Sequence, residues 1–342
     1  MNMEFFRKLP IPKEIKELYP ISGESSRRRA ERDRELKAIL SGKDGRFLLI
    51  IGPCSADSEA PVLDYMLRLR GAADEVKDKI FIVPRLYTNK PRTFCDGYQG
   101  MLHQPDPSGK PDILGGLIAA RQLYIKVMDE TGFSCADEML YPENHRYFSD
   151  VLAYAAVGAR SVEDQQHRLT ASGLDIPVGM KNPPSGDIGV MLNSVAAAQK
   201  GHSFIYRGWD VQSAGNPYSH AILRGYTGAG GEHINNCGYE DLARLCSLYG
   251  ERKLQNPAVV VDVSHSNSAK HYERQPEVAL DVLMSREKNG DIKKLVKGVM
   301  IESYIEDGAQ DAGGGVYGRS ITDGCLGWEK SRKLILKIAD ML

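Results

Sequence analysis

Short apolar runs alternate with stretches of helical periodicity along most of the chain. The runs are rich in Val, Ile and Leu and are bounded by Gly, Pro and polar residues, which is typical of buried strands. The eight predicted strands are 47–51, 80–87, 133–138, 157–161, 177–181, 219–224, 258–263 and 297–302. The predicted helices are 59–76, 113–130, 143–155, 187–200, 239–254, 276–288 and 327–341.

A strand followed by a helix, repeated along a chain, predicts a parallel sheet. Eight such units favour a closed (β/α)₈ barrel, the TIM-barrel fold. A doubly wound open sheet is the structural alternative. No G-x-G-x-x-G string opens the first predicted helix, which weakens the dinucleotide-binding version of that alternative.

Three segments fall outside this repeat. Residues 1–46 carry dense charges of mixed sign and predict a helical N-terminal extension ahead of a barrel over 47–342. Residues 202–217 predict a β-hairpin inserted before the sixth strand. The connection over 88–112 is rich in Pro and Gly, and a loop of this length inside a compact domain is usually functional.

Composition excludes several classes of protein. The chain has 342 residues, of which 42% are hydrophobic and 26% charged, as in a folded globular protein. A net charge of −1 leaves no overall basic field for nucleic acid or an anionic membrane. Apolar runs of roughly 18 residues, which would span a bilayer, are absent, and the first ten residues lack the apolar core of a secretory signal. We therefore expect a cytoplasmic protein, in which six scattered cysteines without a C-x-x-C pair argue against a disulfide framework.

One set of polar residues at the predicted strand ends is soft or anionic. The set is Cys54, His265, Glu302 and Asp323. Taken singly, each has an ordinary interpretation as a buried small residue, a hydrogen-bonded loop residue, a cap or a surface charge. In a barrel, however, the carboxyl ends of all strands share one face. A thiolate, an imidazole and two carboxylates converging there could hold a divalent transition metal.

A second set at the same strand ends is cationic. The set is Arg85, Lys90, Arg92, Arg160, Lys181 and Arg224. Most of the 44 Lys and Arg residues are best interpreted as solvated, but these six follow apolar runs on the predicted active face. Several cations on one face would repel each other unless anions bind there. The set suits a substrate pair that carries a carboxylate and two phosphates.

Several strings that contain these residues carry a resemblance to a known family. They are IGPCS (51–55), PRLYTNKPRT (84–93), GARSVE (158–163), HRLTASG (167–173), PVGMKN (177–182), ILRG (222–225), DVSHSN (262–267), VMIES (299–303) and YGRSITD (317–323). In this order and over residues 10–342, the chain resembles class I 3-deoxy-D-arabino-heptulosonate 7-phosphate (DAHP) synthase, the first enzyme of the shikimate pathway. The resemblance implies a metal-dependent transferase that condenses phosphoenolpyruvate with erythrose 4-phosphate in a barrel.

The resemblance also implies roles for individual residues. The implied metal ligands are Cys54, His265, Glu302 and Asp323. The implied phosphoenolpyruvate contacts are Arg85, Lys90, Glu138, Arg160, Lys181 and Arg224. Arg92 and Thr93 would bind the phosphate of erythrose 4-phosphate. The implied catalytic residues are Lys90, Cys54 and His265, with Lys90 a hypothetical proton donor to the new hydroxyl.

Some strings depart from the family pattern. Ser55-Ala56-Asp57 stands where many relatives have Ser-Ile-His-Asp, and Tyr98-Gln99 replaces a Trp-Lys pair. The extension and the hairpin insertion resemble those of the feedback-inhibited branch, where they build an aromatic amino-acid site and subunit contacts. Residues 139–146 would line that site. We therefore expect an aromatic effector and a homodimer or homotetramer.

Three alternatives stay open at this point. The nearest is a sister enzyme that uses arabinose 5-phosphate, against which the KPRT string argues. A catalytically retired regulatory barrel is a second, against which the intact ligand set argues. A phosphate-binding aldolase barrel is a third, but that chemistry needs a Schiff-base lysine or another metal set. The expected cofactor is one divalent metal ion, and the donor set accepts Mn, Fe, Co or Zn.

Overall fold

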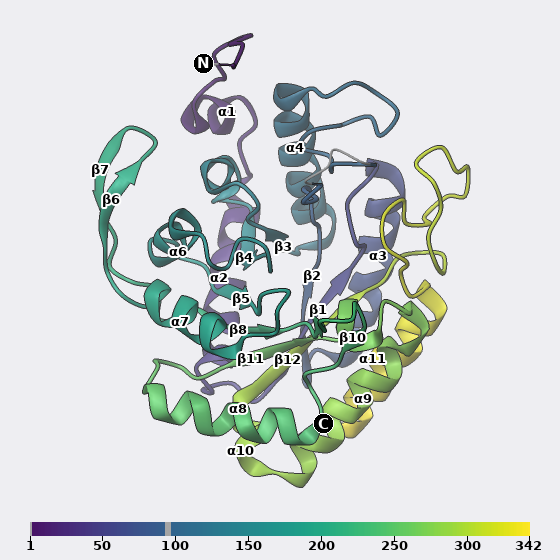
Figure 1. Cartoon of the computed structure of the whole chain (residues 1–342). Coiled ribbons are helices and arrows are strands. Elements are labelled where there is room, and N and C mark those ends of the chain that lie inside the picture. Colours follow the sequence, from purple (N-terminus) through teal and green to yellow (C-terminus); the bar gives the residue numbers. More distant parts are fainter. Residues whose placement is uncertain (1, 93–96) are drawn as a thin grey trace.

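The computed structural model describes residues 2–92 and 97–342 and forms a ring of parallel strands surrounded by helices (Figure 1). The strand order is β2-β1-β12-β11-β8-β5-β4-β3. The bounds are β1 Phe47–Gly52, β2 Ile80–Pro84, β3 Cys135–Glu138, β4 Leu152–Val157, β5 Val178–Lys181, β8 His220–Leu223, β11 Val259–Asp262 and β12 Val296–Glu302. A parallel bridge from Arg85 to Ala136 joins β2 to β3 and closes the ring. The predicted (β/α)₈ barrel is confirmed, and the open sheet is excluded.

The helices lie outside the ring (Figure 1). Their bounds are α3 Glu59–Val76, α4 Ile113–Thr131, α5 His145–Phe148, α6 Gln165–Ser172, α7 Ile188–Ala198, α8 Tyr239–Arg252, α9 Gln275–Lys288, α10 Gly290–Leu295 and α11 Trp328–Met341. All of β1 is buried, with Leu48 and Ile50 in the core inside the ring and Leu49 and Ile51 in the core under the helices. Burial on both faces explains why this strand has an unbroken apolar sequence. Among the described residues, no helix is long and apolar enough to cross a membrane.

Two helices precede the barrel, α1 Pro12–Leu18 and α2 Gly23–Leu40. The residues of α2 that join the core inside the ring are Leu36, Ile39 and Leu40. From the charged face of the same helix, Arg29 Nε donates a 3.1 Å hydrogen bond to the carbonyl oxygen of Leu152 at the start of β4. The extension is helical as predicted and packs on the barrel. A domain boundary at residue 46 stays a prediction.

The predicted hairpin insertion is present before the sixth barrel strand. Its strands are β6 Ser203–Tyr206 and β7 Trp209–Gln212, which pair antiparallel. Arg207 and Gly208 join them with φ of 53° and 78°, and two successive positive φ angles suit the tight turn of a two-residue hairpin. A second small ladder, between β9 Tyr226–Thr227 and β10 His233–Ile234, was not predicted.

The fourth barrel strand differs from the prediction. The strand occupies Leu152–Val157 rather than 157–161, and the predicted helix over 143–155 shrinks to α5 and one short 3₁₀ turn, Pro142–Asn144. The sequence LAYAAV has helical propensity, but all six residues are buried and the strand pairs with β3 on one side and β5 on the other. Tertiary burial overrides local propensity here. Helices α6 and α10 were also not predicted.

Candidate active site and metal centre

A cavity of about 220 Å³ lies at the carboxyl ends of the barrel strands. All six cations predicted at strand ends line it, namely Arg85, Lys90, Arg92, Arg160, Lys181 and Arg224. Glu138, His265 and Asp323 line it as well. Thr93, predicted to act with Arg92, lies outside the described residues. So many cations around one cavity favour an anionic ligand, because unbalanced like charges at short range are costly.

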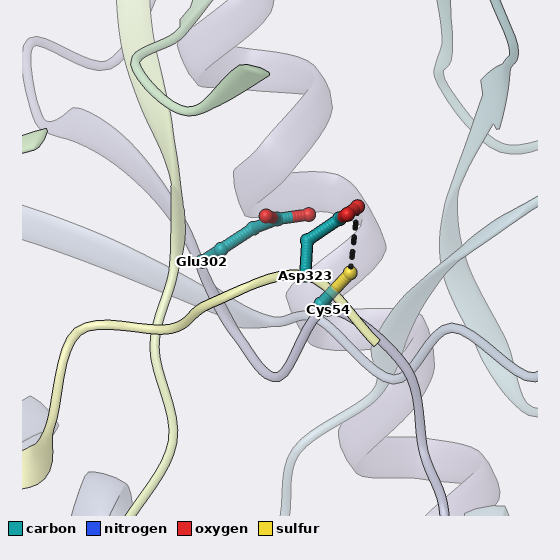
Figure 2. A group of neighbouring side chains, drawn as sticks. All are labelled: Cys54, Glu302 and Asp323. Atoms are coloured by element: carbon teal, nitrogen blue, oxygen red, sulfur yellow. Dashed lines mark hydrogen bonds between the residues drawn. The ribbon is translucent and has the colours of Figure 1, made fainter. Parts of the chain in front are cut away.

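Three of the four predicted metal ligands meet beside this cavity (Figure 2). The ligand atoms of Cys54, Glu302 and Asp323 all lie within 4.8 Å of one another. Cys54 Sγ donates a 3.4 Å hydrogen bond to Asp323 Oδ2, and the Glu302 carboxylate points toward that of Asp323 (Figure 2). We name these three residues the thiol–carboxylate cluster. The spacing fits a divalent transition metal, whose bonds to sulfur and oxygen are about 2.0–2.3 Å long.

Barrel register brings this cluster together. Gly52 on β1 pairs with Glu302, the last residue of β12, and Cys54 follows two residues later. A Cβ atom on Gly52 would lie 2.3 Å from the carbonyl oxygen of Arg85, so only glycine permits this approach. Leu326 N donates to the carbonyl oxygen of Glu302 at 2.9 Å, which returns the loop that carries Asp323 to the end of β12. Segments far apart in sequence therefore supply one site.

His265, the fourth predicted ligand, stands next to the cluster but is not among its three residues. Its Nδ1 lies 2.9 Å from Asp262 Oδ2 and 2.8 Å from Ser264 Oγ. A carboxylate that holds one ring nitrogen leaves the other for a metal, which is the usual arrangement around ligating histidines. The residue has φ of 52°, an uncommon conformation for a side chain with a Cβ. His265 and Asp323 both line the 220 Å³ cavity.

Two cations contact the thiol–carboxylate cluster. Lys90 Nζ lies 2.6 Å from Cys54 Sγ, and Arg85 pairs with Glu302 at 2.8 Å, with both side chains of the latter pair buried. Burial, followed by the charge of Glu302, raises the pKa of the Cys54 thiol to about 12. Partial desolvation would also raise the pKa of Asp323, an exposed residue at the cavity, but Lys90 and other cations outweigh it and lower that pKa to about 2. A metal must therefore displace the thiol proton when it binds.

Glu138 and Lys181 form a buried ion pair in the lining of the same cavity. Lys181 Nζ donates to Glu138 Oε2 at 2.9 Å. Burial would raise the pKa of Glu138, but Lys181 outweighs it and lowers that pKa. The Tyr87 ring lies 3.7 Å from the Arg85 guanidinium and 5.5 Å from Lys181 Nζ. Its face stabilises two cations that would otherwise repel each other.

The loop that follows Cys54 forms hydrogen bonds with two other loops near the site. Ser55 Oγ lies 2.9 Å from Thr322 Oγ1, which ties the loop after β1 to the loop of Asp323. The Tyr98 hydroxyl donates a 3.1 Å hydrogen bond to the carbonyl oxygen of Ala56. Ser55, which the family strings share, and Tyr98, which departs from them, thus both form contacts between loops at the site.

Sequence reasoning missed several residues at the site. Asp262 is fully buried beside His265, and Asp137 is buried at the end of β3. A carboxylate at the end of an apolar run, as in VVVD and CADE, was the available signal for both. Lys270 lines the cavity with φ of 61°, and no pattern in the sequence distinguishes it from a solvated lysine.

A second and larger cavity, of about 510 Å³, lies beside α6 and the β6–β7 hairpin. Its lining combines apolar and charged side chains, including Leu174, Phe204, Val211, Arg29, Asp33, Arg146 and Asp175. His145 and Arg146 come from the 139–146 segment that was predicted to line a regulatory site. Leu140, from the same segment, lines the 220 Å³ cavity instead.

Comparison with known proteins agrees with this geometry. The model of the DAHP synthetase I family matches residues 19–335. The chain belongs to the DAHP synthetase I family. The predicted family and enzyme class, a transferase with DAHP synthase activity in the shikimate pathway, are confirmed.

Members of the DAHP synthetase I family resemble the chain over most of its length. It is 35% identical over 339 residues to the Tyr-sensitive phospho-2-dehydro-3-deoxyheptonate aldolase of Escherichia coli strain K12, covering 96% of the chain and 92% of that relative. The tyrosine-inhibited enzyme of Candida albicans is 39% identical over 313 residues, covering 88% and 82%. The solved structure of the Francisella tularensis SCHU S4 enzyme superposes with a TM-score of 0.91 at 30% identity, covering 99% of the chain and 98% of that structure.

Proposed function

We propose that this family member condenses phosphoenolpyruvate with erythrose 4-phosphate and water, giving DAHP and phosphate, in the 220 Å³ cavity. The observation that carries the proposal is the convergence of six cations beside the thiol–carboxylate cluster. Two phosphates and a carboxylate bring about four to five negative charges, which these cations would balance. The cations also align two mutually repelling substrates, which lowers the entropic cost of the reaction.

The proposed metal ligands are Cys54, His265, Glu302 and Asp323. Their thiolate, imidazole and carboxylate donors suit Mn, Fe, Co or Zn. When bound, such an ion polarises the aldehyde carbonyl of erythrose 4-phosphate as a Lewis acid. His265 would contribute Nε2, because its Nδ1 lies 2.9 Å from Asp262. Cys54 and His265 thus serve the chemistry as ligands, and the reaction needs no protein nucleophile.

The proposed phosphoenolpyruvate contacts are Arg85, Lys90, Glu138, Arg160, Lys181 and Arg224. Arginines suit the phosphate and carboxylate groups because their planar forks bind two oxygens at once. Arg92, on the same cavity wall as Lys90, would bind the phosphate of erythrose 4-phosphate together with Thr93. Glu138 keeps the Lys181 ammonium in place and limits the excess of positive charge in the cavity.

Lys90 is the proposed proton donor. The enol carbon of phosphoenolpyruvate attacks the aldehyde carbon, and the carbonyl oxygen becomes a hydroxyl that needs one proton. Burial would lower the pKa of Lys90, but the thiol–carboxylate cluster outweighs it and raises that pKa. Lys90 is therefore an ammonium at neutral pH and can supply the proton. Water then adds to C2, and phosphate leaves with cleavage of its C–O bond.

Release of phosphate from phosphoenolpyruvate tests the proposed function. The metal-loaded protein is given either erythrose 4-phosphate or arabinose 5-phosphate, and kcat/KM is measured for each. We expect erythrose 4-phosphate to be preferred by at least about a hundredfold, because the KPRT string resembles that of the enzymes that use this sugar. Preference for arabinose 5-phosphate would identify the sister enzyme. Absence of release with both sugars would identify a binding barrel.

An aromatic amino acid is the proposed effector, and the 510 Å³ cavity is its proposed site. Relatives of the chain are named Tyr-sensitive and Trp-sensitive. The cavity offers Phe204 and Leu174 for an aromatic ring, with Arg146 and Asp33 for the carboxylate and ammonium of a free amino acid. Sites for such ligands are typically lined by apolar side chains with a few charged or polar groups.

A homodimer or homotetramer in the cytoplasm is the proposed state of the chain. Phe5 and Phe6 in the N-terminal segment and Ile205 and Trp209 on the hairpin are large apolar side chains exposed to solvent. Large exposed apolar residues on two projecting segments favour contact between subunits. The five described cysteines are free, as expected of a reducing compartment.

A further inference from the structure

The barrel closes between β2 and β3 with little strand pairing, and we call this junction the seam. These strands stand at the two ends of the strand order, whereas every neighbouring pair within that order is joined by a ladder of several residue pairs. In the part of the chain that the structure describes, the seam is closed by the single bridge from Arg85 to Ala136, with Leu86 N donating to the carbonyl oxygen of Ala136 at 2.9 Å. Beyond this bridge, the chain leaves β2 toward Lys90. The ladder alone therefore does not fix the position of Lys90.

The Asp137 side chain supplies hydrogen bonds across this seam. Its Oδ1 accepts from the backbone N of Thr88 at 3.0 Å, and its Oδ2 accepts from Thr88 Oγ1 at 2.7 Å. The Tyr124 hydroxyl on α4 also lies 2.7 Å from Asp137 Oδ2 and 3.0 Å from the carbonyl oxygen of Leu86. Thr88 is fully buried and Asp137 is 4% exposed, so water does not compete for these contacts. The carboxylate takes the place of the strand pairing that the seam lacks.

Asp137 lies between two segments that line the cavity, the one that carries Lys90 and the one that carries Glu138. Thr88 stands two residues before Lys90. Glu138 follows Asp137 directly, donates its backbone N to Asp137 Oδ1 at 2.7 Å, and holds Lys181 with its own side chain. One buried carboxylate thus links the segment that carries Lys90 to the strand end that carries Glu138. A shift of about 1 Å in such a group can cost roughly a hundredfold in rate.

We propose that Asp137 is a positioning residue that holds Lys90 in its place for the condensation. Asp137 is neither in the lining of the 220 Å³ cavity nor in the thiol–carboxylate cluster, and it acts through Thr88. The inference rests on the proposed function of Lys90. We expect the positioning residue to affect mainly kcat rather than substrate binding, because three of the proposed phosphoenolpyruvate contacts, Arg160, Lys181 and Arg224, stand on or after other strands.

The test is a double-mutant cycle between Asp137→Ala and Lys90→Met in the full chain. We expect Asp137→Ala to lower kcat by about 10- to 100-fold, with less than about threefold change in the KM for phosphoenolpyruvate. In the Lys90→Met background, the same change should lower kcat by less than about twofold. Asp137→Asn keeps an acceptor for the Thr88 N–H and should recover part of kcat. Ser134→Ala, which removes a buried hydroxyl without a partner among the described residues, is the matched control and should keep wild-type kcat.

The positioning role is overturned if the effects of the two changes on kcat are fully additive, or if Asp137→Ala has a normal kcat. In either case, an active wild-type protein leaves the proposed function standing. An inactive wild-type protein overturns both. If Asp137→Ala does not fold, as judged by circular dichroism, Tyr124→Phe and Thr88→Val replace it, since each removes one hydroxyl donor to the carboxylate. We expect each to lower kcat by about two- to fivefold and to lose this effect in the Lys90→Met background. Normal kcat in both also overturns the inference.

Discussion

The ammonium of Lys90 lies 2.6 Å from the sulfur of Cys54. This contact joins the two groups of residues that the sequence predicted separately, the cations and the metal ligands. It also places the proposed proton donor directly beside the proposed metal site. Lys90 and Cys54 come from the loops after β2 and β1, which are neighbouring strands of the barrel.

Replacement of Cys54 by serine should weaken metal binding and activity together. Loss of an outer-shell partner alone costs about 10- to 100-fold in affinity, so loss of the thiolate should cost more than about a hundredfold. Serine is nearly isosteric, so the melting temperature should change by only a few degrees. Titration of the metal-free protein with Mn²⁺ or Zn²⁺ measures the affinity. Cys246→Ser, on α8 and away from the cluster, is the control. Equal metal affinities of Cys54→Ser and Cys246→Ser would contradict the proposal that Cys54 is a metal ligand.

Lys90→Met should lower kcat by about 100- to 10,000-fold, the usual contribution of a general acid. Because the cluster raises the pKa of Lys90 above the ordinary lysine value of about 10.4, wild-type kcat should not fall from loss of this proton at neutral or mildly alkaline pH. Lys90→Arg keeps the charge and should bind phosphoenolpyruvate normally while remaining slow. The pH dependence of kcat is measured for all three proteins. Near-normal kcat in Lys90→Met with an unchanged pH profile would remove the proton-donor role.

Phenylalanine, tyrosine or tryptophan should inhibit the enzyme through the 510 Å³ cavity. Phe204→Ala removes an aromatic contact from that cavity and should raise the half-inhibitory concentration by about tenfold, with kcat kept within about twofold. Leu67→Ala, an exposed position on α3, is the control and should leave inhibition unchanged. Flat inhibition curves with all three amino acids at millimolar concentration would remove the proposed effector site.

The buried Arg121 should stabilise the fold through its pair with Asp150. Arg121 is fully buried, pairs at 2.8 Å with the partly exposed Asp150 and also donates to the carbonyl oxygens of Tyr19 and Tyr147, so Arg121→Met should lower the free energy of unfolding by about 3 kcal/mol. Arg68→Met breaks the exposed pair with Asp64 and should cost less than about 1 kcal/mol. Urea unfolding followed by circular dichroism measures both. Equal losses of unfolding free energy in the two variants would show that the buried Arg121 stabilises the fold no more than an exposed pair does.

The contribution of this pair should also depend on pH. Burial would raise the pKa of Asp150, but Arg121 outweighs it and holds that pKa below its ordinary value. A lowered folded-state pKa adds stability above the unfolded pKa of about 3.9, and this stability is lost as the pH falls through the folded pKa. The difference in unfolding free energy between wild type and Arg121→Met should therefore shrink below about pH 4. A constant difference down to pH 2 would show that the carboxylate is not involved.

Residues at the ends of apolar runs were the part of the site that the sequence predicted best. Arg85, Lys181 and Glu302 each follow or end a strand that is buried over all or nearly all of its length, and barrel geometry brings such residues to one face. The β4 strand was misplaced because its alanines favour helix until the neighbouring strands are known. Asp137 and Asp262 were missed because their partners, Thr88 and His265, are defined only by contacts in the folded barrel.

Metal dependence of phosphate release tests the central claim most directly. The purified protein is stripped with a chelator, dialysed and titrated with Mn²⁺ in the presence of phosphoenolpyruvate and erythrose 4-phosphate. We predict no release from the stripped protein and a return of activity that reaches its plateau at one metal ion per chain. Full activity in the metal-free protein would contradict the metal centre at Cys54, His265, Glu302 and Asp323.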